Sequence, residues 1–496
     1  MTNTIADPVV NPRVRQPAYD RDGLKTRIVH IGFGAFHRAH QAVFTDEMLA
    51  KTGGDWGICE MSLFSGDAVI SSLRQQDHLF TVAEKGTDTT EVKMIGAVTE
   101  AMHPLLDGID GLLEKMAEEQ VEIFSLTVTE KGYCANPANG RLDKFHPLIQ
   151  HDLLNPAQPK SAIGYIVEAL RRRFERGLAP VTVLSCDNIQ QNGHVARAVV
   201  LEYASLLDEK LAVWIEQNVT FPCTMVDRIV PAVTEETQNE ITELVGVPDP
   251  CGVACEPFCQ WIIEDNFANG RPEWDVAGAE FVANVVPYEE MKLRMLNGSH
   301  SFLAYLGYLG GYEHISDTML SDDYRRAAFN LMMKEQAPTL DMPKGTDVEG
   351  YARQLIERFS NPSLQHRTWQ IAMDGSQKLP QRMVDAIKHH IAQGTDYSHL
   401  ALGVAGWMRY VSGQDESGQE IDVRDPMVST FQEIYQRVGL HPDVVKEFLS
   451  LDAIFGTSLP ANVGFENAVS EAYLQLLESG ARSAVAALNV NASHSW

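Results

Sequence analysis

Three polar side chains of different chemistry stand close together in an otherwise apolar stretch, residues 291–312. Lys292, Asn297 and His300 interrupt apolar residues that recur every three or four positions, which predicts an amphipathic helix. At about 100° per residue, the three side chains project into one broad sector that spans two turns. An amine, an amide and an imidazole in one sector could bind a hydroxyl group and move its proton. The structural alternative is a core helix with a snorkelling lysine and a satisfied histidine.

A second set of candidates consists of cations in residues 366–382. Arg367, Lys378 and Arg382 lie close together here, although the whole chain is acidic, with a formal net charge of 40 − 67 = −27. So acidic a surface argues against nucleic acid and anionic membranes as partners. The three cations could form a local positive pocket for a small anionic substrate, or simply a solvated charged face.

The elements that would position a cofactor begin near the N-terminus. The apolar run 27–31 predicts a buried strand, and it leads through a GxG turn into a helical pattern over 42–49. Strand, glycine turn and helix in this order open a dinucleotide-binding unit, in which the glycines permit the turn and let backbone amides approach a pyrophosphate. His37 stands where the usual fingerprint has a third glycine, so a plain glycine turn is the alternative. The residues of the turn that we expect at the cofactor are Gly32, Phe33, Gly34, Ala35 and Phe36.

The second predicted strand covers residues 56–61 and carries Glu60 near its end. A dinucleotide fold places an acidic residue there to bind the ribose hydroxyls, which makes Glu60 the candidate. Its distance from Gly32 is 60 − 32 = 28 residues, longer than the usual spacing of about 20. No arginine follows closely enough to bind a 2′-phosphate, so we expect NAD rather than NADP as the cofactor.

Further along, apolar β-branched runs at 121–128 and 181–185 alternate with helical patterns. This alternation predicts an α/β fold whose N-terminal part is a Rossmann-like, doubly wound parallel sheet. Polar clusters follow both runs, at 129–133 and 186–188, where the carboxyl ends of such strands bind ligands. From residue 288 onward helical patterns replace strand patterns, so we expect a mostly α-helical C-terminal domain.

The length of 496 residues suits two domains of ordinary size. We expect an N-terminal arm over 1–24, a Rossmann-like dinucleotide-binding domain over 25–285 and an all-α substrate domain over 286–496. No run approaches the roughly 20 apolar residues that cross a bilayer, and the N-terminus lacks the apolar core of a secretory signal. Seven cysteines, an odd number, suggest reduced thiols and a cytoplasmic protein.

Two further features have an ordinary structural explanation. Cys251, Cys255 and Cys259 are spaced by four, which would place their thiols on one helical face, but no fourth ligand is near in sequence. We therefore expect small buried hydrophobes there and no metal site. Asp227 and Arg228 stand in an apolar run, where an internal ion pair is the simplest interpretation.

The motif GFGAFHRAHQ at 32–41, combined with Lys292, Asn297 and His300, resembles the long-chain polyol-specific dehydrogenase family, which includes mannitol 2-dehydrogenase. The resemblance extends over residues 25–490. It implies a zinc-independent enzyme in which a Rossmann domain, backed by an all-α domain, transfers hydride between a secondary alcohol and NAD.

The resemblance also implies roles for individual residues. Lys292 would be the general base in oxidation and the general acid in reduction, provided that burial and nearby cations lower its pKa from about 10.4. Asn188 and Asn297 would donate hydrogen bonds to the oxyanion. His300 would orient the substrate or Lys292, and Glu289 would pass protons between Lys292 and solvent.

The substrate pocket of the family corresponds to Asp227 and Lys378 in this chain. Two positions depart from the pattern of the mannitol enzyme, because Gln370 replaces an arginine and Lys131 replaces a glycine. Both agree with the branch of the family that interconverts D-mannonate and D-fructuronate, and motifs such as SLTVTEKGYC are most similar to that branch. Lys131 and Arg367 are our candidates for binding the substrate carboxylate, on position and charge.

We therefore expect an NAD-dependent dehydrogenase that interconverts D-mannonate and D-fructuronate. Mannitol, arabinitol, altronate and tagaturonate are alternative substrates or products of the same reaction class. A non-catalytic NAD- and sugar-acid-binding protein is an alternative of a different class, against which a lysine combined with two asparagines argues. A metal enzyme built on the three cysteines is a further alternative, which insensitivity to chelators would exclude.

Overall fold

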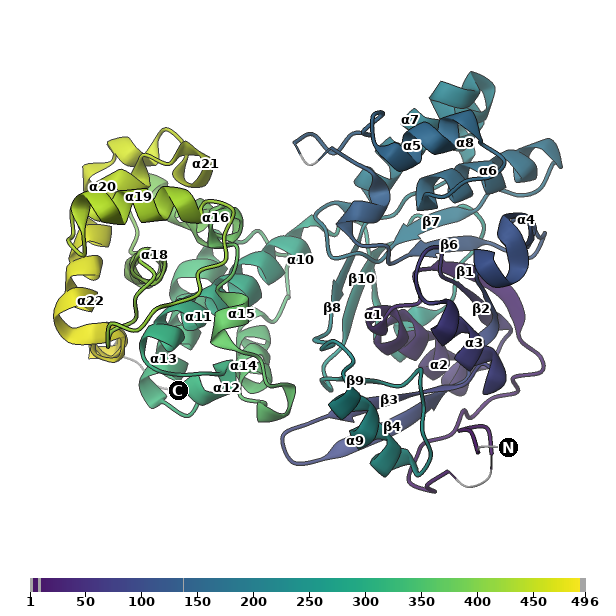
Figure 1. Ribbon diagram of the computed structural model, residues 1–496, viewed down its shortest axis with the longest axis horizontal. Coiled ribbons are helices and arrows are strands. Elements are labelled where there is room, and N and C mark those ends of the chain that lie inside the picture. Colours follow the sequence, from purple (N-terminus) through teal and green to yellow (C-terminus); the bar gives the residue numbers. More distant parts are fainter. Residues whose placement is uncertain (1–2, 8–9, 137, 491–496) are drawn as a thin grey trace. The chain divides into compact units, whose positions relative to one another are not determined.

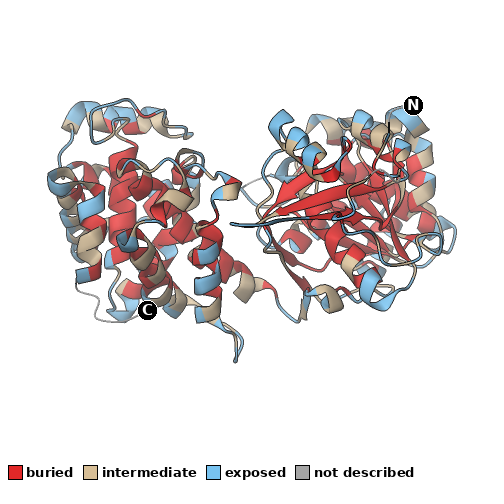
Figure 2. Ribbon diagram, turned by 90° about the horizontal axis from the view of Figure 1, so that it is seen from below, coloured by how far each residue is buried: buried red, intermediate tan, exposed pale blue. Residues whose placement is uncertain are grey.

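Two units, each with a core of its own, make up the protein in this computed structural model, which describes residues 3–7, 10–136 and 138–490. The chain divides into Met1–Val286 and Pro287–Trp496. Figure 1 draws the first unit in purple to teal and the second in green to yellow. Buried residues, red in Figure 2, fill the centre of each unit.

The first unit is organised around a five-stranded sheet in which every strand runs parallel to its neighbours. The strand order reverses between β1 and β6, and doubly wound sheets bind ligands at such a switch point. This topology confirms the predicted α/β fold class with a Rossmann-like sheet. In spatial order the strands are β5 (Val98–Met102), β2 (Trp56–Met61), β1 (Lys25–Ile31), β6 (Ile123–Leu126) and β7 (Thr182–Ser185).

Both faces of the parallel sheet are covered, which explains why its strands read as continuous apolar runs. Along β1, Val29 and Ile31 point to one face and pack with three helices, whereas Ile28 points to the other face. The helices on the first face are α4 (Pro104–Met116), α6 (Ala162–Glu175) and α7 (Asn192–Leu207). The opposite face packs against α2 (Gln41–Thr52) and β10 (Gln260–Glu264).

Two three-stranded sheets complete the first unit. One has the order β4-β3-β9 and the other the order β11-β10-β8. The helical face predicted for Cys251, Cys255 and Cys259 is wrong, because this segment forms β9, which pairs in parallel with β3, and then runs into β10. The remaining bounds are β3 (Phe80–Lys85), β4 (Thr90–Ile95), β8 (Thr224–Asp227), β9 (Val253–Cys255) and β11 (Glu280–Val282).

The second unit is built from helices, as predicted, and every named element of its described residues is helical. Helix α18 (Ser398–Tyr410) lies at its centre and is buried from His399 to Tyr410. It packs against α11 (Ser299–Leu309) and α22 (Val463–Val490), and Figure 1 shows it end-on inside a ring of helices. None of the helices in the described ranges is both long and apolar enough to cross a bilayer.

The single α-helix predicted from residue 291 is replaced by three consecutive pieces. Helix α10 (Val286–Met291) is followed by a π-helical segment, Lys292–Gly298, and then by α11. An apolar spacing of three and four residues does not reveal such a wider turn, because the pattern is the same on either side of it. The angles derived at 100° per residue therefore do not apply between Lys292 and His300.

Candidate functional site

A pocket of 280 Å³ lies in the first unit at the carboxyl ends of β1, β2 and β6. Three of the predicted cofactor residues line it, and these are Gly32, Phe33 and Gly34. The other two, Ala35 and Phe36, belong to the short helix α1 (Ala35–Ala39) and are not among the lining residues. The pocket therefore occupies the place where the strand order predicts a nucleotide.

The two glycines of the turn are required for different reasons. Gly32 has φ +107°, and a Cβ atom at this position would lie 2.0 Å from the backbone oxygen of Thr127. A side chain is excluded there because the ends of β1 and β6 approach too closely. A Cβ atom at Gly34 would meet nothing within 4 Å, so it would extend into the open space beside the turn. This space is what a pyrophosphate bound to the turn would occupy.

Beneath the glycine turn, buried polar side chains form a hydrogen-bonded network. The rings of His30 and His37 stack with centroids 3.4 Å apart, and 2.6 Å separates His37 Nε2 from Glu60 Oε1. His30 Nε2 lies 2.8 Å from Thr127 Oγ1 and 3.1 Å from the carbonyl oxygen of Gly32. His37, which replaces the third glycine of the usual fingerprint, thus ties the first helix to β1 and β2.

The position of Glu60 does not support the predicted contact with a ribose. Its side chain is fully buried and bonded to His37, so it does not line the pocket, whose wall after β2 is formed by the segment 62–66. Successive side chains of a strand point to opposite faces, and the sequence alone does not say which face carries the ligand. Burial raises the pKa of Glu60 to about 8, so its carboxyl group is largely protonated at neutral pH.

The same network places potential metal ligands of His30, His37 and Glu60 within 4.8 Å of one another. Hydrogen bonds engage one ligand atom of each residue, because His37 Nε2 is bonded to Glu60 Oε1 and His30 Nδ1 lies 2.7 Å from Ser125 Oγ. Burial and the charge of Arg38 lower the pKa of His37 to about 3, and the same charge would repel a cation. The geometry therefore favours a hydrogen-bonded network over a metal site. Within the described ranges, the three cysteines discussed above do not form a cluster of this kind.

Asp187 holds the loop beside the pocket, a role that the sequence did not assign to it. Its carboxylate accepts hydrogen bonds from the backbone N–H groups of Val128 (3.1 Å) and Thr129 (2.9 Å) and from the hydroxyl of Tyr133 (2.5 Å). Thr129 has φ +61°, a conformation uncommon for a residue with a side chain. The polar clusters that follow β6 and β7 are thereby joined. An acid two residues after the end of a buried strand was the available signal.

The predicted oxyanion donor of the first unit, Asn188, is the residue after Asp187 in the sequence. Asn188 is exposed on the turn after β7. This turn is held by Asn192, whose side-chain amide donates to the backbone oxygens of Ser185 and Asp187, each at 3.1 Å. Lys131 is exposed on a short 3₁₀ helix that follows β6.

The pair of charged residues at the end of β8 is buried. Asp227 is the last residue of this strand and is 5% exposed. Arg228 forms an internal ion pair, and its partner is Glu84. The same guanidinium group donates to the backbone oxygens of Ala39 (2.7 Å) and Glu256 (3.0 Å), which fixes it within the first unit.

Four predicted residues of the second unit lie within 289–300. Lys292 is the first residue of the π-helical segment and is only 8% exposed. Glu289 precedes it in α10 and is equally buried. Asn297 stands near the other end of the segment and is half-buried, and His300 is buried in the first turn of α11.

Aromatic and cationic side chains surround His300. Its ring stacks on that of Phe359 with centroids 5.1 Å apart, and the ring of His366 is also 5.1 Å away. Burial and the charges of His366, Arg382 and Lys378 hold the pKa of His300 well below its usual value, so the imidazole is neutral. Its Nε2 atom is buried and has no hydrogen-bond partner among the described residues. The hydrogen-bonding capacity of this nitrogen is therefore unused among the described residues.

The cations of this cluster also affect one another. Burial and the charge of Arg382 lower the pKa of Lys378 to about 8, and burial lowers the pKa of Arg382 to about 10. Lys378 Nζ donates to the backbone oxygen of Ile371 at 3.3 Å. A bound anion would stabilise both charged forms, because an opposite charge offsets the cost of burial. The cluster around His300 can therefore act as an anion site.

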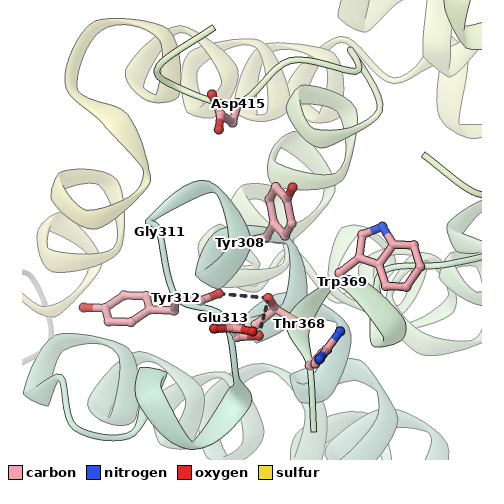
Figure 3. Close-up of a pocket in the computed structure, with 8 residues that line it drawn as sticks. Tyr308, Gly311, Tyr312, Glu313, Thr368, Trp369 and Asp415 are labelled. Carbon is pink, nitrogen blue, oxygen red and sulfur yellow. Dashed lines mark hydrogen bonds between the residues drawn. The ribbon is translucent and has the colours of Figure 1, made fainter. Parts of the chain in front are cut away.

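Arg367 does not belong to this cluster. It lines a 380 Å³ pocket of the second unit, shown in Figure 3, together with Tyr308 and Trp369. Thr368 Oγ1 donates to two backbone oxygens of the pocket wall, at 2.9 and 3.1 Å, along the dashed lines. None of the cations named around His300 lines this pocket.

Two family models match the sequence, one over each unit. The model described as the mannitol dehydrogenase Rossmann domain matches residues 26–276. The model described as the mannitol dehydrogenase C-terminal domain matches residues 284–477.

Individual relatives match over nearly the whole chain. The D-mannonate oxidoreductase of Escherichia coli (strain K12) is 62% identical over 483 residues, which cover 96% of this chain and 99% of the relative. The ternary complex of Pseudomonas fluorescens mannitol 2-dehydrogenase with NAD and D-mannitol has a TM-score of 0.81 and 37% identity, and the match covers 99% of this chain and 100% of that chain. Substrate-free D-sorbitol dehydrogenase has a TM-score of 0.90 at 34% identity, with coverages of 96% and 98%.

Proposed function

Because the chain belongs to the mannitol dehydrogenase family, we propose that it is an NAD-dependent dehydrogenase that interconverts D-mannonate and D-fructuronate. The observation that carries the choice of a sugar acid over an uncharged polyol is the cationic cluster around His300. Asp374 and Asp425 partly offset the charge of Lys378, and the carboxylate of a hexonate would add a counter-ion that an uncharged polyol lacks. The relative with 62% identity, which is named for D-mannonate, supports the same choice.

The first unit supplies the cofactor site in this proposal. Gly32 and Gly34 would bring the backbone of the turn against the pyrophosphate, and Phe33 would contact the nucleotide from the same turn. The segment 62–66 would line the ribose and carries no cation for a 2′-phosphate, which favours NAD over NADP. Bound NAD would accept a hydride from the alcohol carbon, and NADH would return one to the ketone.

The second unit supplies most of the acid–base chemistry. Lys292 Nζ would take the hydroxyl proton during oxidation and return it during reduction, and Glu289 would exchange that proton with solvent. Asn188 and Asn297 would donate hydrogen bonds to the developing oxyanion, and losing one such donor raises a barrier by roughly 2.7–4 kcal/mol. His300, which is neutral and has Nε2 available, would orient a neighbouring hydroxyl.

Among the cations, Lys378 is our first choice for the substrate carboxylate. It stands in the cluster at His300, and a bound anion would stabilise its charged form, which burial disfavours. Arg367 lines a different pocket and Lys131 is exposed, so both remain alternatives to Lys378 for this contact. Asp227 would bind substrate hydroxyls.

The cysteines Cys59, Cys134, Cys186, Cys223, Cys251, Cys255 and Cys259 are all free, in keeping with a cytoplasmic protein.

A substrate panel tests the reaction. D-mannonate, altronate, mannitol and arabinitol are offered with NAD and with NADP, and NADH or NADPH formation is read from its absorbance. We expect the highest kcat/KM for D-mannonate with NAD and no effect of chelators. A higher kcat/KM for mannitol than for D-mannonate would refute the choice of a sugar acid as the substrate. NADH binding without turnover of any substrate would indicate a non-catalytic protein.

Substitution of Lys292 tests the mechanism. Lys292→Met should lower kcat by about 10²–10⁴-fold, the usual contribution of a general acid or base, while NADH still binds. Lys334→Met is the matched control, because Lys334 is also a lysine of a π-helical segment but is exposed. A Lys292→Met variant whose kcat stays within about tenfold of the wild type would remove Lys292 from this role.

A further inference from the structure

Three π-helical segments of the second unit pack together. They are Lys292–Gly298, Leu331–Gln336 and Pro380–Val384, and the first contacts both of the others. Segments of this kind are rare, they occur mostly as single wide turns, and they are frequent at functional sites. Two of the three are remote in sequence from Lys292, so their meeting is a property of the fold.

Gly298 is the point at which the three segments meet. A Cβ atom at this position would lie 2.2 Å from Gln336 Nε2 and 2.6 Å from the backbone oxygen of Arg382. The absence of a side chain thus lets the second and third segments close over the first. Gln336 ends the second segment and is fully buried.

Polar contacts fix this meeting point on the C-terminal side of Lys292. Ser299 Oγ donates to Gln336 Oε1 at 3.1 Å. Arg382 Nη1 donates to Ser301 Oγ at 3.0 Å and to the backbone oxygen of Asn297 at 3.5 Å. These contacts engage residues on both sides of His300.

The register of the first segment decides where Lys292 points. A π turn is closed by an i→i+5 hydrogen bond and so contains one residue more than an α turn. If the segment relaxed to α-helix, Lys292 would rotate by about 100° relative to His300. A side chain that holds the wide turn therefore controls the alignment of the amine with the imidazole.

We propose that Gln336 is a positioning residue for the dehydrogenase reaction, holding the segment Lys292–Gly298 in its π register through Ser299 and the gap at Gly298. This inference rests on the proposed function, because it assigns Gln336 an effect on catalysis through Lys292. Gln336 itself is assigned no contact with substrate or cofactor.

The test compares two buried glutamines. Gln336→Met keeps the length of the side chain but removes the bond to Ser299. Gln76→Met is the control, because Gln76 is also buried and hydrogen-bonded, to Leu79 and Asp249 of the first unit. We expect Gln336→Met to lower kcat for D-mannonate by at least about tenfold, with KM for NAD within twofold and a shifted pH profile of kcat. Gln76→Met should lower stability only.

Two further measurements keep the outcome decisive. Ser299→Ala should also lower kcat. The double variant should be no slower than Gln336→Met alone, because the two substitutions remove the same hydrogen bond between Ser299 and Gln336. Amide hydrogen exchange over 292–301 should be faster in Gln336→Met than in the wild type or in Gln76→Met.

Unchanged kcat and unchanged exchange in a folded Gln336→Met variant would overturn the proposal. If Gln336→Met does not fold, kcat and exchange of Ser299→Ala decide in its place. A wild-type protein that does not turn over D-mannonate would instead refute the proposed function, and hydrogen exchange over 292–301 would then decide whether Gln336 holds the segment.

Discussion

Alanine substitutions at Gly32 and at a control glycine, Gly54, can separate the cost of a strained backbone conformation from the cost of a steric clash. Gly32 has φ +107° and Gly54 has φ +101°, so alanine at either position adopts a conformation that L residues avoid, at about 1–2 kcal/mol. At Gly54 a Cβ atom meets nothing within 4 Å, whereas at Gly32 it lies 2.0 Å from the backbone oxygen of Thr127. Gly54→Ala is therefore the control, because it is destabilised by the backbone conformation alone.

The additional cost at Gly32 comes from the sheet. The offending atom belongs to the backbone directly after β6, which pairs with β1, so it cannot swing aside as a flexible side chain would. Overpacking of this kind usually costs about 1–3 kcal/mol. We therefore expect Gly54→Ala to lose about 1–2 kcal/mol of stability and Gly32→Ala about 2–5 kcal/mol.

Denaturant unfolding and NADH titration measure the two consequences. Both variants are unfolded under the same conditions, and NADH binding is followed by the fluorescence of the reduced nicotinamide. We expect weaker NADH binding in Gly32→Ala only, because the turn must move away from Thr127 to accept the methyl group. Equal losses of stability in the two variants, or wild-type NADH affinity in Gly32→Ala, would refute the reasoning.

Three further predictions concern ionisable groups. Glu60→Gln should gain stability relative to the wild type as pH rises from about 4.5 to about 8, because the raised pKa makes ionisation costly in the folded state and the amide does not ionise; parallel pH profiles of unfolding would contradict this. Asp187→Asn should lose about 1–3 kcal/mol and loosen the loop at Thr129, since one amide oxygen cannot replace two carboxylate oxygens; hydrogen exchange of this loop is the measurement. The KM for D-mannonate should rise above a pH of about 8, where Lys378 loses its charge, and Lys378→Arg should delay that rise; a KM that is flat through pH 9 in the wild type would remove Lys378 from the carboxylate site.

The fold of the first unit could be predicted because its signals are local. The run 56–61 coincides with β2, and Gly32 and Gly34 stand where the turn requires them. The orientation of Glu60 could not be predicted, because it depends on His37, a residue of another element whose ring lies next to that strand only in the folded chain.

The second unit shows a different limit of sequence reasoning. The apolar spacing predicts helices there, but a π turn adds one residue without changing the apolar composition. The orientation of Lys292 relative to His300 therefore could not be predicted from the sequence. The cluster of His300 with Lys378 had a visible signal in the basic segment 366–382, but Arg367 of the same segment lines another pocket.

The central helix of the second unit has a consequence for synthesis on the ribosome. Helix α18 is apolar and buried between α11 and α22, and α22 begins about fifty residues after α18 ends. The emerging chain therefore exposes an apolar helix until its last cover has been translated, whereas the segments of the parallel sheet have by then left the exit tunnel. Truncation within 463–490 should consequently produce chains that require chaperones or aggregate, with a first unit that is already folded.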